Sequence, residues 1–474
     1  MVDFLRMLNT KKIIRNIKEN KNWLIYFLSI IVAMIFFSYL GFNTKQDIAV
    51  VLILALVLGT VMFWEIRLSF ALFGVAVLFT SGLLSVNKFI EFSSLNIIIF
   101  LAGMMIFVGY LEKNAFFEYL INKLILLIGG GGKRIIFLLM ILSGIFAAMV
   151  DEVTSILFML SITLYLTARL QVNPLPFVML IVFATNIGSS ATAIGNPVGV
   201  MIALSAHLSF FDFLVNATPI SFVSLLVCIG VSYLYFRKEI DEFAEKARKI
   251  ALSGLVESHE ADNKTKTSAI LFIVVFSLLI LHAQIEDMLG LEKNAMLLGT
   301  ALSVSGLVLA LEGKNAKHFV ETKVDWWTLF FFIMLFASVG VLEETGVMEI
   351  MTRWFIQLFG MNKALAMLAT IGLSGILSAF LDNVLAVAVF IPLIHDLQAS
   401  QIGGTYLWWS LLISATFFGN LTIIGSTANI VALGLIEKRG LPKISFIEWF
   451  KAGLIVVTAT VLTASLLLYL THVG

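Results

Sequence analysis

Two short polar stretches decide how this chain folds: ATNIGSSATAIGNP, from Ala184 to Pro197, and GNLTIIGSTAN, from Gly419 to Asn429. Each interrupts a long apolar segment with small residues and with amide or hydroxyl side chains. Within the first, two glycines permit a sharp bend, and Pro197 suits the first turn of a new helix, where its missing N–H is not needed. The stretches therefore predict two broken helices, over residues 176–208 and 405–437.

The sequence around these stretches is too apolar for an ordinary soluble enzyme. Of its 474 residues, 60% are hydrophobic and 13% are charged, with a mean hydropathy of +1.02, whereas soluble domains contain about 25% charged residues. The near balance of 31 basic and 30 acidic residues gives no indication of a nucleic-acid partner. A helix needs about 20 apolar residues to cross the hydrocarbon core. The clear candidates are 23–42, 47–64, 68–86, 95–111, 214–236, 267–285, 293–312, 324–342 and 446–471.

The regions that contain the two breaks are copies of each other. At an offset of 231 positions, Asp151 matches Asp382 and Gly188 matches Gly419. One register held over about eighty residues indicates a true internal repeat. The repeated units cover roughly 95–208 and 326–437. With the helices that follow them, they define repeat 1 as residues 95–236 and repeat 2 as residues 326–471.

Acidic residues interrupt each repeat where a simple span should have none, at Asp151-Glu152 and at Asp382-Asn383. We expect them at the tips of re-entrant helical hairpins, 135–168 and 363–396. The chain then crosses the membrane eleven times, with a cytoplasmic N-terminus and an external C-terminus. This arrangement puts 26 of the 31 basic residues inside, as the positive-inside rule requires. It also orients the repeats oppositely, which is the architecture of many secondary transporters.

The remaining segments have simpler expected roles. A basic arm at 1–22 and a charged linker at 237–266 are expected in the cytoplasm, with scaffold helices at 23–94 and 267–325. The arm is too long and too basic for a cleavable signal peptide. We therefore expect the first apolar run to be a retained helix, and the protein to reside in the cell membrane.

The three carboxylates at the hairpin tips are the candidate transport residues. A carboxylate near the bilayer centre costs at least about 2.5–3.5 kcal/mol, so it persists where it faces a cavity, an ion or a proton. No Lys or Arg lies within fifteen residues of Asp151, Glu152 or Asp382. Two alternatives stay open: tips that are hydrated at the membrane interface, and breaks that are simple kinks. Glu112 and Glu343, which the repeat pairs, are assigned to solvated helix ends.

These motifs resemble the ion transporter superfamily. The likeness rests on SGIFAAMVDEVT from Ser143, on the stretch that ends at Pro197, on SAFLDNV from Ser378 and on GNLTIIGSTAN from Gly419. The chain looks closest to the branch of arsenite permeases, NhaD-type Na⁺/H⁺ antiporters and the P-protein of melanosomes. It resembles more distantly the divalent-anion/Na⁺ symporters that carry dicarboxylates and citrate. The resemblance implies an all-α homodimer in which a transport domain moves like an elevator against a scaffold domain.

The resemblance also implies that the hairpin tips and helix breaks form paired ion sites beside one substrate site. In repeat 1 the matching residues are Asp151, Glu152, Thr154, Asn186, Ser189, Ser190, Thr192 and Asn196. In repeat 2 they are Asp382, Asn383, Asn420, Thr422, Ser426, Thr427 and Asn429. If the coupling ion is Na⁺ rather than H⁺, its candidate ligands are Asp151, Asn196, Asp382, Asn383 and Asn429.

The tips depart from the patterns of these relatives. The symporter branch is expected to carry Ser-Asn-Thr at each tip, whereas this chain has Asp-Glu-Val and Asp-Asn-Val, with no Arg in either tip or break. A doubly charged carboxylate would meet three carboxylates in a low-dielectric site, which is unfavourable. In the closer branch, Glu152 replaces an Asn and Asn196 replaces an Asp. One charge has thus moved from the break to the tip.

The expected function is secondary transport of a small inorganic ion or anionic solute, coupled to H⁺ or Na⁺. The open alternatives are a Na⁺-coupled organic-anion symporter and an anion channel of the P-protein type. An intramembrane enzyme would need Asp151 and Asp382 as a catalytic pair, and no catalytic residue or cofactor is expected. The sequence from Gly129 to Arg134 is not a Walker loop. The expected partners are a small ionic solute, the bilayer and a second copy of the chain, with an ATPase only if the protein is part of an arsenite-type pump.

Overall fold

The computed structural model describes residues 21–36, 42–63, 66–117, 119–120, 123, 131–249 and 262–474. These residues form helices joined by turns, with no β-strand among them. Nine of the described helices are long and apolar enough to cross a membrane, so the expected all-helical membrane protein is confirmed. Three of the nine are α7 (Gly132–Met149), α8 (Glu152–Arg169) and α19 (Lys363–Leu381), the arms of the expected hairpins. The N-terminal arm lies largely outside the described residues.

The chain divides into two compact units. The first comprises residues 1–95 and 326–354. Its described helices are Lys21–Phe36, α2 (Thr44–Met62), α3 (Arg67–Thr80), α4 (Val86–Phe92) and α17 (Trp326–Glu344). Helix α3 packs against α2 and α17, and α17 also packs against α4. The contact with α4 is close, because a Cβ on Gly340 would lie 2.3 Å from the Phe92 ring.

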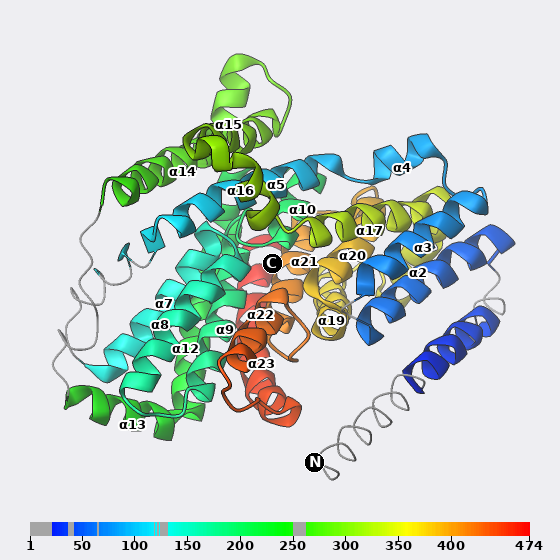
Figure 1. The fold of residues 1–474 in the computed structure, drawn as a ribbon. Helices are drawn as coiled ribbons and strands as arrows, with labels where there is room; N and C mark the ends of the chain where they lie inside the picture. The colour runs from blue at the N-terminus through cyan, green and yellow to red at the C-terminus, as the bar shows by residue number, and fades with distance from the viewer. Residues whose placement is uncertain are drawn as a thin grey trace, which may run out of the picture. The chain divides into compact units, whose positions relative to one another are not determined.

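The second unit comprises residues 96–325 and 355–474 and contains both hairpins and both breaks. Its helices that belong to repeat 1 are α5 (Leu95–Lys113), α7, α8, α9 (Leu175–Gly188), α10 (Pro197–Ser205) and α12 (Thr218–Tyr235). A short helix, α11 (Phe210–Asp212), and a π-helical turn, Phe213–Ala217, lead into α12. Helices α7, α8, α9 and α12 run side by side in Figure 1 and pack against one another.

The same unit contains the helices of repeat 2 and those that join the repeats. The repeat 2 helices are α19, α20 (Asn383–Gln398), α21 (Thr405–Phe418), α22 (Thr427–Lys438) and α23 (Phe446–His472). The joining helices are α13 (Arg237–Arg248), α14 (Asn263–Leu289), α15 (Ala295–Glu312) and α16 (Ala316–Lys323). One further helix, α18 (Val347–Phe359), begins in the first unit and ends in the second.

At each predicted break the chain leaves one helix and starts another. Helix α9 ends in a 3₁₀ turn, Ser189–Ala191, and α10 starts at Pro197 after Asn196 accepts a hydrogen bond from the Gly199 N–H at 2.7 Å. In repeat 2 the chain leaves α21 at Phe418 and re-enters a helix at Thr427. There Ser426 accepts from the Ala428 N–H at 3.2 Å. Polar caps of this kind satisfy N–H groups that a new helix start leaves without partners.

The predicted tip aspartates lie where one helix of each repeat ends and the next begins. Asp151 caps α8 by accepting a hydrogen bond from the Thr154 N–H at 2.8 Å. Asp382 separates α19 from α20 and accepts from the Val384 N–H at 2.9 Å. Each carboxylate therefore helps to start the second arm of its hairpin, where negative charge also suits the positive end of the helix.

Some predicted boundaries were wrong. The span expected over 68–86 ends at Thr80, because Gly82 adopts a left-handed conformation (φ +73°) and Ser85 then caps α4. Helix α14 starts four residues before the expected 267, because Asp262 accepts from the Thr265 N–H at 2.7 Å. The expected linker 237–266 contains α13, which buries Ile240, Phe243 and Ala247 at helical spacing.

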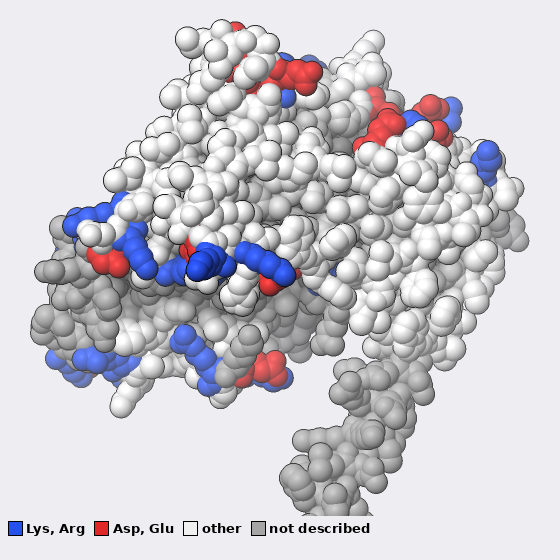
Figure 2. Space-filling view, turned by 45° about the horizontal axis from the view of Figure 1, so that its top comes forward, with Lys and Arg blue, Asp and Glu red and all other residues white. Residues whose placement is uncertain are grey.

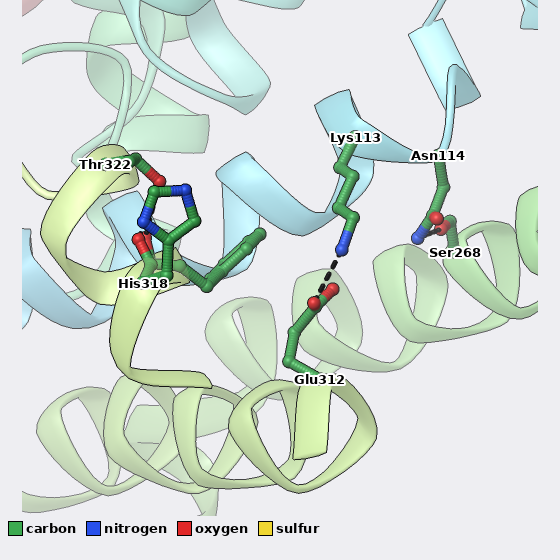
Figure 3. Close-up of polar contacts among 7 residues, drawn as sticks. Lys113, Asn114, Ser268, Glu312, His318 and Thr322 are labelled. Atoms are coloured by element: carbon green, nitrogen blue, oxygen red, sulfur yellow. Dashed lines mark hydrogen bonds and ion pairs between the residues drawn. The ribbon is translucent and has the colours of Figure 1, made fainter. Parts of the chain in front are cut away.

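Several charged residues lie near helix ends, and others lie along α13. Figure 2 shows a mostly uncharged face on which Lys, Arg, Asp and Glu gather into small groups. At the end of α5, Lys113 pairs with Glu312 at 2.6 Å and Asn114 donates to Ser268 at 3.1 Å (Figure 3). Glu112 pairs with Lys323 at 2.7 Å. The predicted helix-end position of Glu112 is confirmed, but the carboxylate is held in an ion pair.

Candidate functional site

Glu152 lies at the point where the hairpin tips and the helix breaks meet. Its side chain is 1% exposed, at the first position of α8. Its carboxylate lies 3.4 Å from Ser189 Oγ in the first break, 3.5 Å from Ser426 Oγ in the second break, and 3.4 Å from Asn383 Nδ2 at the second tip. The structure thus brings four of the predicted segments together around one buried carboxylate.

The contact between Glu152 and Asn383 shows where the two repeats meet. The two residues are 231 positions apart, which is the offset of the internal repeat, so they occupy equivalent places in the two repeats. Equivalent residues can touch only near the axis that relates one repeat to the other. The centre of the site therefore lies at the junction of the repeats.

Asn186 is the amide that joins the two breaks. Its Nδ2 donates to Asn420 Oδ1 at 2.8 Å and to Asn429 Oδ1 at 2.9 Å. Its Oδ1 accepts from Ser426 Oγ at 3.0 Å. Both ends of this buried side chain are thus satisfied by repeat 2, as a buried amide requires. Asn420 also donates to the Phe183 carbonyl at 3.3 Å, which adds a second link between the repeats.

Two predicted ligands are occupied in holding their own breaks. Asn429 donates to the Gly419 carbonyl at 2.8 Å and to the Thr422 carbonyl at 2.9 Å. Asn196 donates to Ser189 Oγ at 2.7 Å while its Oδ1 caps α10. These amides shape the non-helical backbone, whose polar groups would otherwise lack partners at membrane depth.

The hydroxyl groups of the breaks tie each break to its hairpin. Thr192 donates to the Ala148 carbonyl, and Thr422 donates to the Ala379 carbonyl. Both carbonyls precede a tip aspartate by three residues, so the same bond recurs in each repeat. Ser190 bonds to Ser221 of α12 at 2.6 Å.

The two tip aspartates engage the starts of helices. Asp151 is half-buried, and its bond goes to the backbone of Thr154, whose own side chain is also half-buried. Asp382 is 7% exposed, and besides the Val384 N–H it accepts from Thr427 Oγ1 at 3.3 Å. Thr427 thus links the second tip to the start of α22. Around Glu152, by contrast, the neighbours come from both repeats.

The Glu152 carboxyl group has no basic partner among the described residues. The Lys and Arg ion pairs recorded there involve carboxylates at helix ends and in α13, not Glu152. Its neighbour Asn383 is 1% exposed, and its Oδ1 is buried without a hydrogen-bond partner in the described part of the chain. A carboxyl group without a basic partner among the described residues and an unpaired amide oxygen therefore lie together in a buried place.

Two residues of the surrounding shell were not predicted from the sequence. Trp449 of α23 is fully buried and donates from Nε1 to the Asn420 carbonyl at 3.1 Å. Ser221 of α12 bonds to the first break. Both lie on helices without a polar cluster, so nothing in their local sequence distinguishes them. Within the described ranges, no group of three or more His, Cys, Asp or Glu residues forms a metal site.

The chain matches known membrane transporters along most of its length. A family model described as "Citrate transporter" matches residues 60–414 and 339–473. An uncharacterized transporter of Mycobacterium tuberculosis is 33% identical over 380 residues, which are 80% of this chain and 86% of that protein. The P protein of Homo sapiens is 25% identical over 453 residues, which are 80% of this chain and 54% of that protein.

Two solved structures share the fold. The YdaH transporter of Alcanivorax borkumensis aligns with a TM-score of 0.54 at 16% identity, covering 84% of this chain and 88% of that one. MtrF of Neisseria gonorrhoeae, described as illuminating a class of antimetabolite efflux pumps, aligns with a TM-score of 0.56 at 14% identity, covering 84% of each chain. At such low identity the likeness shows the fold alone.

Proposed function

Because the chain belongs to the citrate transporter family of the ion transporter superfamily, and is a membrane transporter and not an enzyme, we propose that it is a secondary active transporter. It moves a small inorganic ion or an anionic solute, coupled to H⁺ or Na⁺ by antiport or symport. The likeness to the P protein agrees with the resemblance that the motifs carry.

One observation carries this proposal: at the junction of two repeated helix breaks lies a buried carboxylate that has no basic partner in the part of the chain that the structure describes. Glu152 is 1% exposed and contacts residues of both repeats. A permanently ionised group in such a place is costly, so it persists where a cation or a proton compensates it. A group that gains and loses its compensating charge is suited to couple a solute to an ion gradient.

We propose an elevator-like mechanism in which the hairpins and breaks move together across the membrane. The hydrogen bonds from Thr192 and Thr422 to the hairpin backbones support this, because they fasten each break to its tip. The Asn186 contacts fasten one break to the other. The proposal includes eleven crossings, inverted repeats with re-entrant hairpins, a cytoplasmic N-terminus and a homodimer in the cell membrane.

A second candidate is a Na⁺-coupled symporter of organic anions, which the description of the matching family favours. The site disfavours a free polycarboxylate. Glu152 has no basic partner in the described residues, and Asp382 directly precedes Asn383, which contacts Glu152. An anion of low charge fits this environment better than a citrate-like anion.

Transport assays on purified protein test the proposal. We expect proteoliposomes to take up or release solute when an H⁺ or a Na⁺ gradient is imposed, and Asp151→Asn and Asp382→Asn to reduce that flux. The matched control is Glu437→Gln, which removes an exposed carboxylate that is ion-paired to Lys443 at 2.6 Å. Unchanged flux in both aspartate variants would show that the tips do not take part.

Electrical recordings separate this proposal from the channel alternative. A domain that moves once per cycle passes few charges per second, because such motions take microseconds to milliseconds or longer. Single-channel currents from the reconstituted protein would contradict the transporter mechanism.

A further inference from the structure

We infer that Thr218 and Ser221 of α12 are positioning residues for the first break. They hold the turn Ser189–Ala191 in the orientation that keeps Ser189 beside Glu152. The inference rests on the proposed function and names two side chains, outside both tips and both breaks, on which the shape of the site depends. Both act through the turn, because their hydrogen bonds reach its backbone and one of its hydroxyl groups.

Thr218 directs its hydroxyl group out of its own helix. Its Oγ1 lies 2.7 Å from the Ala191 carbonyl oxygen and 3.3 Å from the Phe213 carbonyl oxygen. A threonine hydroxyl has one proton to donate, and the shorter bond is the stronger one, so the proton goes to Ala191. By contrast, Thr163 in α8 and Thr460 in α23 donate to the carbonyl four residues back in their own helices. Thr218 therefore serves the break rather than its own helix.

A π-helical turn allows Thr218 to reach the break. Pro219 lies inside a helical span and has no N–H, and in an α-helix its ring would clash with the Val215 carbonyl, four residues back. The chain avoids this clash with the wider turn Phe213–Ala217, in which the Thr218 N–H bonds to the Phe213 carbonyl, five residues back. The Thr218 hydroxyl is thus available for a partner outside the helix.

Ser221 holds the same turn from a position further along α12. Its Oγ lies 2.6 Å from Ser190 Oγ, which in turn lies 2.8 Å from the Ile187 carbonyl oxygen. Both bonds can form only if Ser190 gives its proton to the carbonyl and accepts one from Ser221. Ser190 is 0% exposed and Ser221 is 1% exposed, so bulk water does not compete for this bond.

The two contacts fix the rotation of the turn. Ser189–Ala191 is a 3₁₀ turn, in which successive side chains point about 120° apart. Ser190 and the Ala191 carbonyl face α12. Ser189 therefore faces another side of the turn, where its Oγ lies 3.4 Å from the Glu152 carboxyl group. A rotation that released the contacts with α12 would carry Ser189 away from Glu152.

The second break is held by its following helix in a different way. Trp449 of α23 is fully buried and donates from its indole to the Asn420 carbonyl at 3.1 Å. Helix α23 contains no proline and no π-helical turn between Phe446 and His472. The first break thus depends on two hydroxyl groups, whereas the second is held by a large side chain that its surroundings fix in place. Removing a hydroxyl group from α12 should loosen the first break alone.

Amide hydrogen exchange of the full chain in detergent tests the inference without any transported solute. Thr218→Val keeps the shape of the side chain but leaves the Ala191 carbonyl without its donor. We expect the amides of residues 184–197 to exchange about tenfold faster, because the loss of one hydrogen bond allows local opening by up to about that factor. The amides of residues 419–429 should exchange at the parent's rate. Thr218→Ser, which keeps the hydroxyl group, should restore the parent's rate throughout.

Transport supplies a readout that a merely structural role would not move. Radioactive Na⁺ uptake and the internal pH dye pyranine report flux into proteoliposomes under an imposed H⁺ or Na⁺ gradient. Thr218→Val should raise the half-saturating concentration of the driving cation about tenfold, whereas a loss of folded protein would lower only the maximal rate. Ser224→Ala is the matched control on α12. Its hydroxyl group is buried without a hydrogen-bond partner in the described part of the chain, so both measurements should stay unchanged.

Two outcomes would overturn the inference: unchanged exchange over residues 184–197 in Thr218→Val, or faster exchange there with an unchanged half-saturating concentration. If Thr218→Val does not fold, Ser221→Ala decides by the same measurements, with an expected effect of about threefold, because Ser190 keeps its bond to the Ile187 carbonyl. Parent protein without flux under either gradient would refute the proposed function, while hydrogen exchange would still decide whether α12 holds the turn.

Discussion

The two hairpin tips share the same pattern of hydrogen bonds but differ in the side chain that follows the aspartate. In both repeats an aspartate starts the second arm, and a threonine from the break bonds to the backbone three residues before it. The next residue differs: repeat 1 has Glu152 where repeat 2 has Asn383. These two side chains face each other at 3.4 Å. The two repeats therefore share these hydrogen bonds, and at the position where they meet only repeat 1 has an acidic residue.

The backbone at the tips differs as well. Asp151 is extended, with φ of 173°, whereas Asp382 has φ of +86°. A side chain other than glycine rarely adopts a positive φ and does so at a cost of about 1–3 kcal/mol. Asp382 offsets this cost through its bonds to the Val384 N–H and Thr427. The second tip is thus the more strained of two otherwise equivalent turns.

Moving the charge from one repeat to the other is the strongest test of this comparison. Glu152→Asn should reduce ion-coupled transport about a hundredfold, the upper range of coupling between two sites. Adding Asn383→Glu should restore at least about a tenth of the flux, because the carboxylate returns to the same junction from the opposite repeat. Initial rates in proteoliposomes at a fixed gradient measure both. A double variant no better than the single one would show that the repeats are not interchangeable around this centre.

The equivalent glycines Gly188 and Gly419 should respond unequally to alanine. A Cβ on Gly188 would lie 2.2 Å from the Gly144 Cα, whereas a Cβ on Gly419 would come no closer than 3.0 Å to a carbonyl oxygen. Gly188→Ala forces two backbones apart and should cost about 4 kcal/mol or more. Gly419→Ala needs only a small shift and should cost about 1–2 kcal/mol. Unfolding temperatures and the yield of monodisperse protein compare the two, and equal losses would contradict the difference in packing.

The smallest effect is expected outside the repeated core, at α13, which packs on α7 of repeat 1. There Lys133 pairs with Asp241 at 2.5 Å, and both side chains are about half exposed. The hydrogen bond from Lys133 holds the pKa of Asp241 below its usual value. Because the folded-state pKa is lowered, the pair stabilises the protein above the unfolded pKa of about 3.9, and this is lost as pH falls through the folded-state pKa.

Solvent and salt screen an exposed pair of this kind. We therefore expect Lys133→Gln to leave the unfolding temperature at pH 7 unchanged within error. Any difference between the parent and Lys133→Gln should disappear in acid, where Asp241 is protonated in both. A large loss of stability at pH 7 would show that the pair holds α13 in place.

The broken helices and hairpin turns could be predicted because helix ends depend on nearby residues. Pro197 cannot donate in the middle of a helix, and Asp151 can cap the helix that follows it, whatever the rest of the chain does. The offset of 231 likewise required only the comparison of the sequence with itself. Helix α13 was not predicted, because its many charged residues are typical of a linker and outnumber the three buried apolar residues at helical spacing.

The sequence by itself determined that this is an all-helical membrane protein with two repeated breaks and two acidic tips. The tertiary structure decided which carboxylate is central. Asp151 and Glu152 are adjacent in the chain, but only Glu152 meets Ser426 and Asn383. The contacts that join the two repeats at the site link residues more than 230 positions apart, as between Asn186 and Asn420. Such contacts depend on how two whole repeats pack, and local sequence patterns carry no information about that packing.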